Sequence, residues 1–299
     1  MLDGIKTSFS ISDLAQLTGV SPHSIRIWER RYQLFNPGRT DGNIRRYDND
    51  DLKKLLNISV LLKEGHKISD LAILSEQQLT IAVHASLSKN KDYQPAINDL
   101  KVAMLHFDTA QFEATYNKLV NRLSFYDLFL EILIPFLEEI GSLWQTNSIT
   151  VAHEHYISNL IRQKLFFQIE NLPAPTANRK SQYILFLPLN ELHEIGLMFI
   201  HYVLRLHGHN SIYLGPQVDI PSLQGVTEQP SRVFITYLTF APAEEELADF
   251  FKDLRSHVML KSDQLWAVGS RVRGYRKHSS WTNLHLFPTL GEILVKIKI

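Results

Sequence analysis

The sequence predicts a three-part fold: a winged helix-turn-helix over residues 1–78, a four-helix bundle over 79–175, and a Rossmann-like or flavodoxin-like α/β domain over 176–299. Three observations support this division. Short helical patterns with glycine and proline breaks stand near the N-terminus, longer capped helical patterns follow, and apolar strands alternate with helices towards the C-terminus. A chain of 299 residues is long enough for two or three domains, because single domains usually have about 100–200 residues.

The composition excludes several classes of protein. The chain has no cysteine, which excludes disulfides, thiolate metal sites and cysteine nucleophiles and is typical of a reducing compartment. The first ten residues lack the apolar core of a signal peptide, and no later run approaches the roughly 18 apolar residues of a membrane span. We therefore expect a cytoplasmic protein that has no membrane partner.

The charges are segregated along the chain although the formal net charge is zero. Residues 21–47 contain six arginines against two acidic residues, whereas residues 123–161 contain no lysine or arginine. Such asymmetry indicates separate modules with separate partners.

The first module has the helix start and stop signals of a helix-turn-helix. Apolar residues at helical spacing from Ile11 to Leu17 are followed by Gly19, and Ser21-Pro22 starts a second helix that runs to about Tyr32. Residues 36–47 form a predicted hairpin, or wing, flanked by arginines that would grip phosphates while the second helix reads bases. A purely solvated charged face is the alternative. The candidate DNA-binding residues are Ser24, Arg26, Arg30, Arg31, Arg39, Asn43, Arg45, Arg46 and Tyr47.

The middle of the chain predicts further helices rather than one long coiled coil. A helix from about residue 50 to 64 and a short helix at 70–74 complete the first module, and the heptad pattern is not sustained beyond Leu79. Pro135 is expected to kink the third bundle helix, and a proline-containing linker sets a boundary near residue 175. The bundle helices are predicted at 93–107, 108–123, 125–144 and 151–169.

The last module alternates strands and helices, which predicts a parallel sheet with covering helices. Neither a GxGxxG nor a GxxxxGK[ST] motif occurs, so a dinucleotide or a nucleoside triphosphate is disfavoured. Strands are expected at 183–189, 211–214, 233–238 and 264–268, helices at 195–206 and 244–254, and a last element at 290–298.

Glu191, His193 and Gly196 directly follow the first of these strands. Ligands bind at the carboxyl ends of strands in open α/β sheets. A carboxylate two residues before the histidine could fix the tautomer of His193 and raise its basicity as a metal ligand.

The first module resembles the MerR family. The family's pattern is matched by Trp28-Glu-Arg-Arg-Tyr32, Pro37-Gly-Arg-Thr40 and Arg45-Arg-Tyr47. The resemblance implies a winged DNA-binding domain that works as a dimer or higher homo-oligomer on a repeated or palindromic double-stranded operator.

Two further motifs resemble those of the cobalamin-binding, light-responsive MerR repressors. Glu191-x-His193-x-x-Gly196 is similar to the lower-ligand motif, which implies that His193 binds cobalt, that Glu191 orients it and that Gly196 permits close approach of the corrin. Trp144 followed after nine residues by Glu154-His155 is similar to the motif that covers the upper face and its adenosyl group. The implied cofactor is adenosylcobalamin, held between the bundle and the α/β domain.

The chain departs from this family at several positions. Thr236 stands for the usual serine in the hydroxyl-x-Leu element that ends at Leu238, and Gly269-Ser270 replaces a Gly-Gly pair beside the slot for the nucleotide tail. Gln145 replaces the histidine that commonly follows the tryptophan in light-sensing members, which puts a bis-histidine light state in doubt. His153 is expected to face solvent.

Three functional hypotheses follow. The first is a DNA-binding transcriptional repressor, not an enzyme, whose oligomeric state and operator binding are controlled by adenosylcobalamin, with release by light. The second keeps the DNA reader but has a degenerate sensor that does not bind cobalamin. The third, a cobalamin-dependent methyltransferase or mutase subunit, is disfavoured because no segment has the roughly 250 residues of the catalytic barrel.

Overall fold

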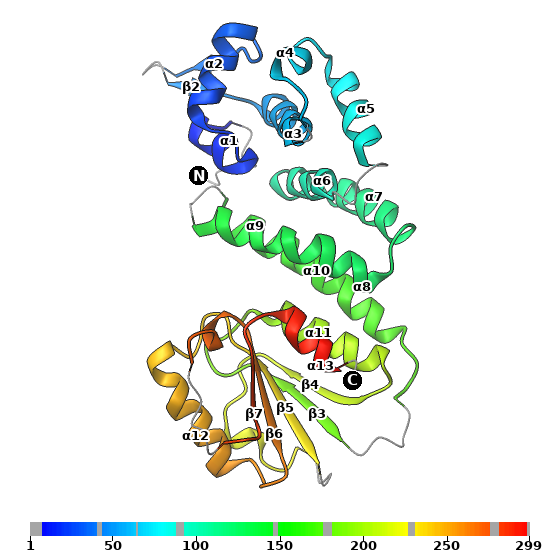
Figure 1. Ribbon diagram of the computed structural model, residues 1–299, viewed down its shortest axis with the longest axis vertical. Helices are drawn as coiled ribbons and strands as arrows, with labels where there is room; N and C mark the ends of the chain where they lie inside the picture. The colour runs from blue at the N-terminus through cyan, green and yellow to red at the C-terminus, as the bar shows by residue number, and fades with distance from the viewer. Residues whose placement is uncertain are drawn as a thin grey trace. The chain divides into compact units, whose positions relative to one another are not determined.

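The computed structural model divides the chain into two compact units, Met1–Ile161 and Arg162–Ile299 (Figure 1). The division falls inside helix α10 (Val151–Glu170), so the boundary near residue 175 stays a prediction. The described residues are 8–40, 44–63, 65–87, 93–145, 149–175, 181–226, 231–275 and 281–297.

The first unit begins with the predicted helix-turn-helix and its wing. Ser10 and Asp13 form a capping box that starts the first helix, and Gly19 ends it in the left-handed conformation at φ +73°. The hydroxyl of Ser21 accepts from the backbone N–H of Ser24 and starts the second helix. The elements are α1 (Ile11–Thr18), α2 (Pro22–Tyr32), β1 (Gly38–Arg39), β2 (Arg45–Arg46), α3 (Asn49–Lys63), α4 (Ile68–Leu71) and α5 (Glu76–Leu87).

The predicted bundle helices follow, and the last of them, α10, extends into the second unit. Asp108 and Ser124 cap two of them through the backbone N–H groups of Gln111 and Asp127. The irregularity expected at Pro135 is a π-helical turn directly before α9, because an enlarged turn accommodates a helix that meets a proline. The elements are α6 (Gln94–Leu105), α7 (Thr109–Val120), α8 (Phe125–Leu128), η1 (Phe129–Leu133), α9 (Ile134–Gln145) and α10.

A buried lysine joins the bundle to the helix-turn-helix and pairs with a partly exposed glutamate. Lys101 of α6 is only 4% exposed, and its Nζ lies 2.6 Å from Glu139 Oε2 of α9 and 3.4 Å from the carbonyl oxygen of Leu17 in α1. Burial lowers the pKa of Lys101, whereas the carboxylate of Glu139 acts in the opposite direction. Lys101 therefore links helix α1 of the helix-turn-helix to helix α9, which carries Trp144.

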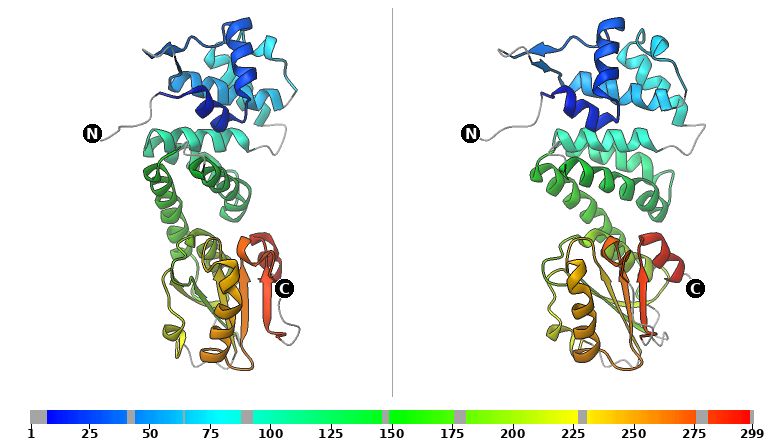
Figure 2. Two further views of the ribbon diagram at one scale, coloured as in Figure 1. Left: turned by 90° about the vertical axis from the view of Figure 1, so that its left-hand side faces the viewer. Right: turned by 60° about the vertical axis from the view of Figure 1, so that its left-hand side comes forward.

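The second unit contains a five-stranded sheet in the order β4-β3-β5-β6-β7, with every neighbouring pair parallel. Helices α11 and α13 cover one face and α12 the other, as Figures 1 and 2 show. The chain leaves β3 for β4 on one side and returns to β5 on the other, so a topological switch point lies between β3 and β5. The strands are β3 (Gln182–Phe186), β4 (Asn210–Gly215), β5 (Arg232–Tyr237), β6 (Gln264–Val268) and β7 (Leu284–Phe287).

The helices of this unit agree with the sequence pattern, and two elements were not predicted. Strand β7 is only four residues long and mostly only partly buried, and helix α5 of the first unit lacks a sustained heptad repeat. The helices are α11 (Glu194–Leu206), α12 (Leu247–His257) and α13 (Leu290–Ile297), with short 3-10 turns η2 (Pro221–Leu223), η3 (Glu244–Glu246) and η4 (Ser270–Val272).

A buried histidine makes the α/β unit acid-sensitive. His201 of α11 packs against Tyr213, and its Nδ1 lies 3.0 Å from the hydroxyl of Ser211. Burial, assisted by the charge of Arg205, lowers the pKa of His201 from 6.5 to about 4. The unfolded chain therefore binds a proton between these values while the folded chain does not, so stability is present above pH 6.5 and is lost as the pH falls.

We expect the α/β unit to lose about 3 kcal/mol of unfolding free energy between pH 6.5 and pH 4 through His201, because one pKa unit corresponds to about 1.4 kcal/mol. Urea unfolding read by hydrogen-exchange mass spectrometry would report this unit separately. His201→Gln should flatten the profile over this range. An equally steep loss in the variant would assign the acid sensitivity to other groups.

Candidate cofactor and DNA-binding sites

The helix-turn-helix presents exposed arginines on two of its elements. Helix α2 carries Arg26, Arg30 and Arg31, and the wing carries Arg39 and Arg46. Each of these five side chains is exposed, as a phosphate- or base-contacting group must be. Ser24 is partly covered and packs its hydroxyl 2.9 Å from that of Ser21, and Asn43 lies outside the described residues.

Glu29 of α2 fastens the wing to the second helix. Its carboxylate accepts from Arg45 Nε at 2.9 Å and from the hydroxyl of Tyr47 at 2.9 Å. The hydrogen bond and the charge of Glu29 raise the pKa of Arg45. Tyr47 is 1% exposed and pairs its backbone with that of Phe9, so it holds the wing from inside and does not offer its ring to DNA. Glu29 was not among the predicted functional residues, although it lies inside the Trp28–Tyr32 motif.

The upper-face motif occupies the end of α9 and the start of α10. Trp144 is 50% exposed, which is unusual for an indole without a partner surface. One oxygen of Glu154 lies 2.6 Å from His155 Nδ1 and the other accepts from Ser158, so the carboxylate fixes the exposed imidazole of His155. The side chain of Gln145 lies outside the described residues.

His153 does not face solvent as predicted. It is 3% exposed, its ring stacks on Phe107 at 4.6 Å, and its Nδ1 lies 2.8 Å from the hydroxyl of Thr150. The prediction was wrong because the helix packs this face against the loop after α6, a long-range contact that local spacing does not show.

Glu191 and His193 form a locked pair beyond the carboxyl end of β3. One carboxylate oxygen of Glu191 lies 2.6 Å from His193 Nδ1 and 3.0 Å from the His193 backbone nitrogen. The other oxygen accepts from the backbone N–H groups of Thr239, Phe240 and Ala241 at 2.8, 2.6 and 3.1 Å. The carboxylate is fully buried, whereas the side chain of His193 is 59% exposed.

These contacts determine the protonation of the pair. Burial alone would raise the pKa of Glu191, but the hydrogen bonds from the His193 ring and from the backbone of Phe240, His193 and Ala241 prevail and lower it to about 2. An ionised carboxylate only accepts hydrogen bonds, so Nδ1 of His193 carries the proton. Nε2 is then the nitrogen with the lone pair that a metal requires.

Glu194, the residue after His193, anchors the start of α11. Its Oε1 lies 2.8 Å from Arg162 Nε, and its Oε2 accepts from the hydroxyl of Tyr213 at 2.8 Å. The segment that carries His193 is therefore held at both ends, by Glu191 before the histidine and by Glu194 after it. Neither partner of Glu194 was predicted, because both are distant in the sequence.

Exposed apolar side chains accompany His193 at this edge of the sheet. Leu189 and Leu192 stand in the loop after β3, and Phe240 stands in the loop after β5. The backbone oxygen of Phe240 accepts from Arg271 Nε at 2.9 Å, and the guanidinium of Arg271 lies 5.9 Å from the Phe240 ring centre. Three exposed apolar side chains in two neighbouring loops indicate a surface for an apolar ligand.

The remaining predicted residues lie at the ends of β5 and β6. Thr236 and Leu238 are both fully buried, and within the described part of the chain the hydroxyl of Thr236 has no hydrogen-bond partner. Gly269 has φ +115°, and a Cβ there would collide with the carbonyl of Leu238, so this position accepts only glycine. The hydroxyl of Ser270 lies 3.5 Å from the carbonyl oxygen of Thr239, at the limit of a hydrogen bond. The sheet thus gathers Glu191, His193, Gly196, Thr236, Leu238, Gly269 and Ser270 at one edge.

Two regions of the chain match known families. Residues 9–78 match the MerR HTH family regulatory protein, and residues 96–167 match the B12 binding domain. Over most of its length the chain is also similar to two proteins of Myxococcus xanthus. It is 27% identical to the HTH-type transcriptional repressor CarH, over 94% of this chain and 95% of that one. It is 29% identical to the HTH-type transcriptional repressor CarA, over 81% of each.

The chain contains a MerR-type helix-turn-helix and a B12-binding domain. Its relatives of similar length are named as repressors, which confirms the prediction of a regulator and not an enzyme. Among solved structures, the monomethylamine corrinoid protein of Methanosarcina barkeri superposes with a TM-score of 0.54 at 14% identity, over 69% of this chain and 99% of that one. At this identity the likeness concerns the fold alone, and it confirms the predicted helical region followed by a parallel α/β sheet.

The residues at the carboxyl edge of the sheet have the chemistry that a B12 cofactor requires. A histidine with a fixed tautomer, three exposed apolar side chains and a buried hydroxyl without a partner among the described residues lie where the resemblance places the cofactor. One contact restricts the space: a Cβ on Gly196 would come within 2.8 Å of the Tyr237 ring. The chemistry of the residues present thus fits the group, whereas the ring of Tyr237, a neighbour that was not predicted, occupies the space beside Gly196.

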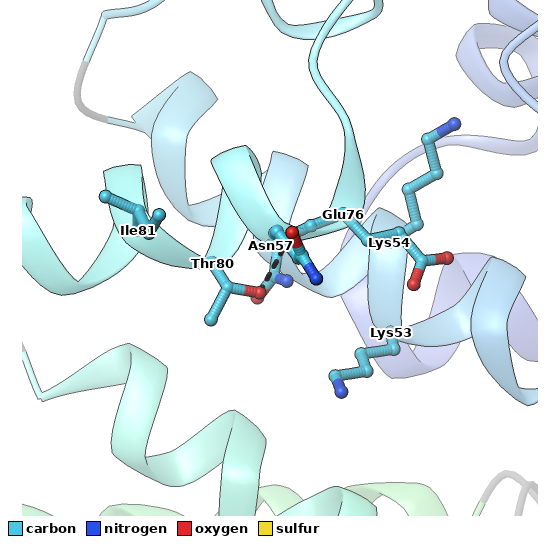
Figure 3. A pocket seen from close by; sticks show the side chains of 7 residues that line it. Lys53, Lys54, Asn57, Glu76, Thr80 and Ile81 are labelled. Carbon is cyan, nitrogen blue, oxygen red and sulfur yellow. Dashed lines mark hydrogen bonds between the residues drawn. The ribbon is translucent and has the colours of Figure 1, made fainter.

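A separate cavity of about 370 Å³ lies between α3 and α5 of the regulator (Figure 3). Lys53, Lys54 and Asn57 of α3 line it together with Glu76, Gln77, Thr80 and Ile81 of α5, and Figure 3 shows these side chains. It contains none of the residues predicted to bind DNA or cofactor. In the described segments, no helix is long and apolar enough to cross a membrane.

Proposed function

We propose that this regulator is a transcriptional repressor whose operator binding and oligomeric state are controlled by adenosylcobalamin, with light as the releasing signal. The observation that carries the proposal is the exposed His193 ring, whose tautomer a fully buried Glu191 fixes. An ordinary surface histidine has no need of a carboxylate that also binds three backbone N–H groups of another loop. The similarity to CarH and CarA supports repression.

In this proposal His193 is the lower cobalt ligand, through Nε2. Bound adenosylcobalamin would supply a cobalt centre for His193 and a cobalt–carbon bond that light can break. Leu189, Leu192 and Phe240 would bury apolar surface of the cofactor around the histidine. Gly196, Thr236, Leu238, Gly269 and Ser270 would shape the walls of the site, and the buried hydroxyl of Thr236 would gain a partner.

Trp144, Glu154 and His155 are proposed to cover the upper face of the cofactor. Trp144 offers an exposed indole, and Glu154 and His155 offer a fixed carboxylate–imidazole pair. Covering Trp144 would remove a large exposed apolar surface from water, which gives cofactor binding a driving force in this unit.

In this proposal the arginines of the helix-turn-helix and its wing bind the operator DNA. Arg26, Arg30 and Arg31 of α2 would enter the major groove, and Arg39 and Arg46 of the wing would contact phosphates, with Arg45 held by Glu29. A homo-oligomer, a dimer or a tetramer, would engage several half-sites at once and gain apparent affinity through effective concentration. A cofactor that favours one oligomeric state thereby changes DNA occupancy.

The proposal is tested by the mass of the protein in the dark and after illumination. Purified protein is mixed with adenosylcobalamin in the dark, gel-filtered, and measured by absorption and light scattering before and after green light. We expect a coloured oligomer in the dark that changes mass in the light. A coloured protein whose mass and spectrum ignore light would remove the photoreceptor step, for which Gln145 already gives a reason.

A second candidate function is supported by the Tyr237 ring, which fills the space beside Gly196, and by Ser270, which stands where the resemblance has the second glycine of a Gly-Gly pair. In this alternative the DNA reader is retained and the α/β unit works without cobalamin as an assembly module. The same experiment separates the two functions, since an assembly module would oligomerise without colour.

Replacing Arg46 is expected to weaken DNA binding without changing sequence preference. Arg46→Ala should lower the affinity for all duplexes, because a wing arginine neutralises a phosphate. The slope of log Kd against the logarithm of the salt concentration should become smaller by about 1. Fluorescence anisotropy over a salt series measures both effects. Arg122→Ala, at an exposed position outside the winged module, removes the same charge and should change neither; an equal loss in both variants would point to net charge alone.

A further inference from the structure

The ring of Tyr237 lies against Gly196 at the start of α11. Tyr237 is the last residue of β5, and Gly196 is the third residue of α11. A Cβ built on Gly196 would stand 2.8 Å from two carbon atoms of the Tyr237 ring, Cε2 and Cζ, and 3.2 Å from Cδ2. The ring therefore occupies the space that any side chain at position 196 would need.

Gly196 is not required by its own backbone. Its φ lies outside the left-handed range, so alanine would be accepted by the helix and would favour it. The three atoms nearest to a Cβ at this position all belong to the Tyr237 ring, so this ring is the first obstacle that a side chain would meet. The glycine thus leaves open a space that the chain fills with its own tyrosine.

This space lies next to the proposed cobalt ligand. His193 caps α11 and Gly196 follows three residues later, so both lie on one face of the first helical turn. The resemblance assigns the open side of Gly196 to the approach of the corrin. A corrin and the Tyr237 ring cannot both occupy that space.

We propose that Tyr237 is a gate that controls access of a corrinoid to His193, and that its ring must leave Gly196 before the cofactor seats. This inference rests on the proposed function and adds the residue that sets its selectivity and affinity. The gate moves by side-chain rotation, because the backbone on its C-terminal side is pinned. The N–H of Leu238 donates to Val268 at 2.7 Å, and the next three N–H groups bind Glu191.

The contact is tested first without any ligand. In the wild-type background, Gly196→Ala should lower the melting temperature, because the new Cβ displaces the Tyr237 ring. In the Tyr237→Ala background the same change should raise it, because alanine is the better helix former and the ring nearest to its methyl group has been removed. A decrease of the same size in both backgrounds would show that Tyr237 does not occupy this space, and would overturn the gate.

The gate itself is tested by binding of adenosylcobalamin in the dark. If the closed ring predominates at about nine molecules in ten, Tyr237→Ala should tighten Kd about tenfold, because the competent fraction divides the intrinsic Kd. Tyr237→Phe keeps the ring and should bind like wild type. Absorption difference titrations measure all three proteins.

Four outcomes separate the gate from the proposed function. If wild type binds the cofactor and Tyr237→Ala binds it more tightly, both the gate and the proposed function are supported. If Tyr237→Ala binds the cofactor and wild type binds none, the gate is supported in its closed form, and control of the natural chain by cobalamin is rejected. Equal binding by wild type and Tyr237→Ala overturns the gate and leaves the function. No binding by either protein overturns both.

Discussion

Replacing Glu191 with alanine is expected to lower the unfolding free energy of the α/β unit by about 3–5 kcal/mol, because the change leaves several buried donors without an acceptor. One carboxylate oxygen serves three consecutive N–H groups of the loop after β5, and the other serves His193. Alanine removes both oxygens and leaves a cavity at a fully buried position.

Urea unfolding read by hydrogen exchange on the α/β unit would measure this loss. Glu191→Gln is the matched variant, because its amide oxygen can still accept from one side while its NH2 group opposes the other donors. It should lie between wild type and Glu191→Ala. If Glu191→Ala lowered the unfolding free energy by less than about 1 kcal/mol, the loss would be close to that of a surface substitution. Such a small loss would mean that the N–H groups of the loop find other acceptors.

Removing Asp263 is expected to destabilise the same unit by a similar amount. Its Oδ2 lies 2.6 Å from Arg232 Nη2, 3.1 Å from Arg232 Nε and 2.6 Å from the backbone nitrogen of Leu260. Both side chains of the ion pair are buried, at the amino end of β5 and the loop before β6. Asp263→Ala would leave an uncompensated guanidinium among apolar groups, at a cost of about 3–5 kcal/mol.

The double variant Arg232→Met, Asp263→Leu tests the cause of that loss. It removes both charges and keeps most of the volume, so it should recover a large part of the stability lost by Asp263→Ala. It will not recover all of it, since the N–H of Leu260 and the carbonyl of Val258 lose their partners. A double variant that is less stable than Asp263→Ala would show that the volume and the backbone contacts dominate over the buried charge.

Local signals were sufficient to predict much of the fold. Helix α2 runs from Pro22 to Tyr32 as predicted, because a serine cap, a proline at the first position and a glycine turn are all written in neighbouring residues. Strand β6 also has its predicted bounds, Gln264–Val268, since an apolar run is bounded there by polar residues and a glycine. The order of three modules followed from the same local patterns.

Contacts between distant residues account for what the sequence did not show. His153 was expected in solvent and is buried on Phe107, and Tyr47 was expected at the DNA and is buried on Phe9. Glu29 and Tyr237 were not singled out, because their partners lie 16 or more residues away. Only the close pair of Glu191 and His193 could be foreseen as a hydrogen bond, and even there the three donors from the loop after β5 were not visible.

The most direct test of the account is whether His193 retains adenosylcobalamin. Wild type, His193→Ala and the control His209→Ala, all in the dark, are incubated with the cofactor, gel-filtered, and compared by their absorption spectra per mole of protein. We predict a coloured wild type and control with a histidine-ligated cobalt spectrum, and a His193→Ala protein that loses most of the cofactor while remaining folded and binding DNA at low salt. A colourless wild type, or equal retention by His193→Ala with an unchanged spectrum, would contradict the assignment of His193 as the cobalt ligand.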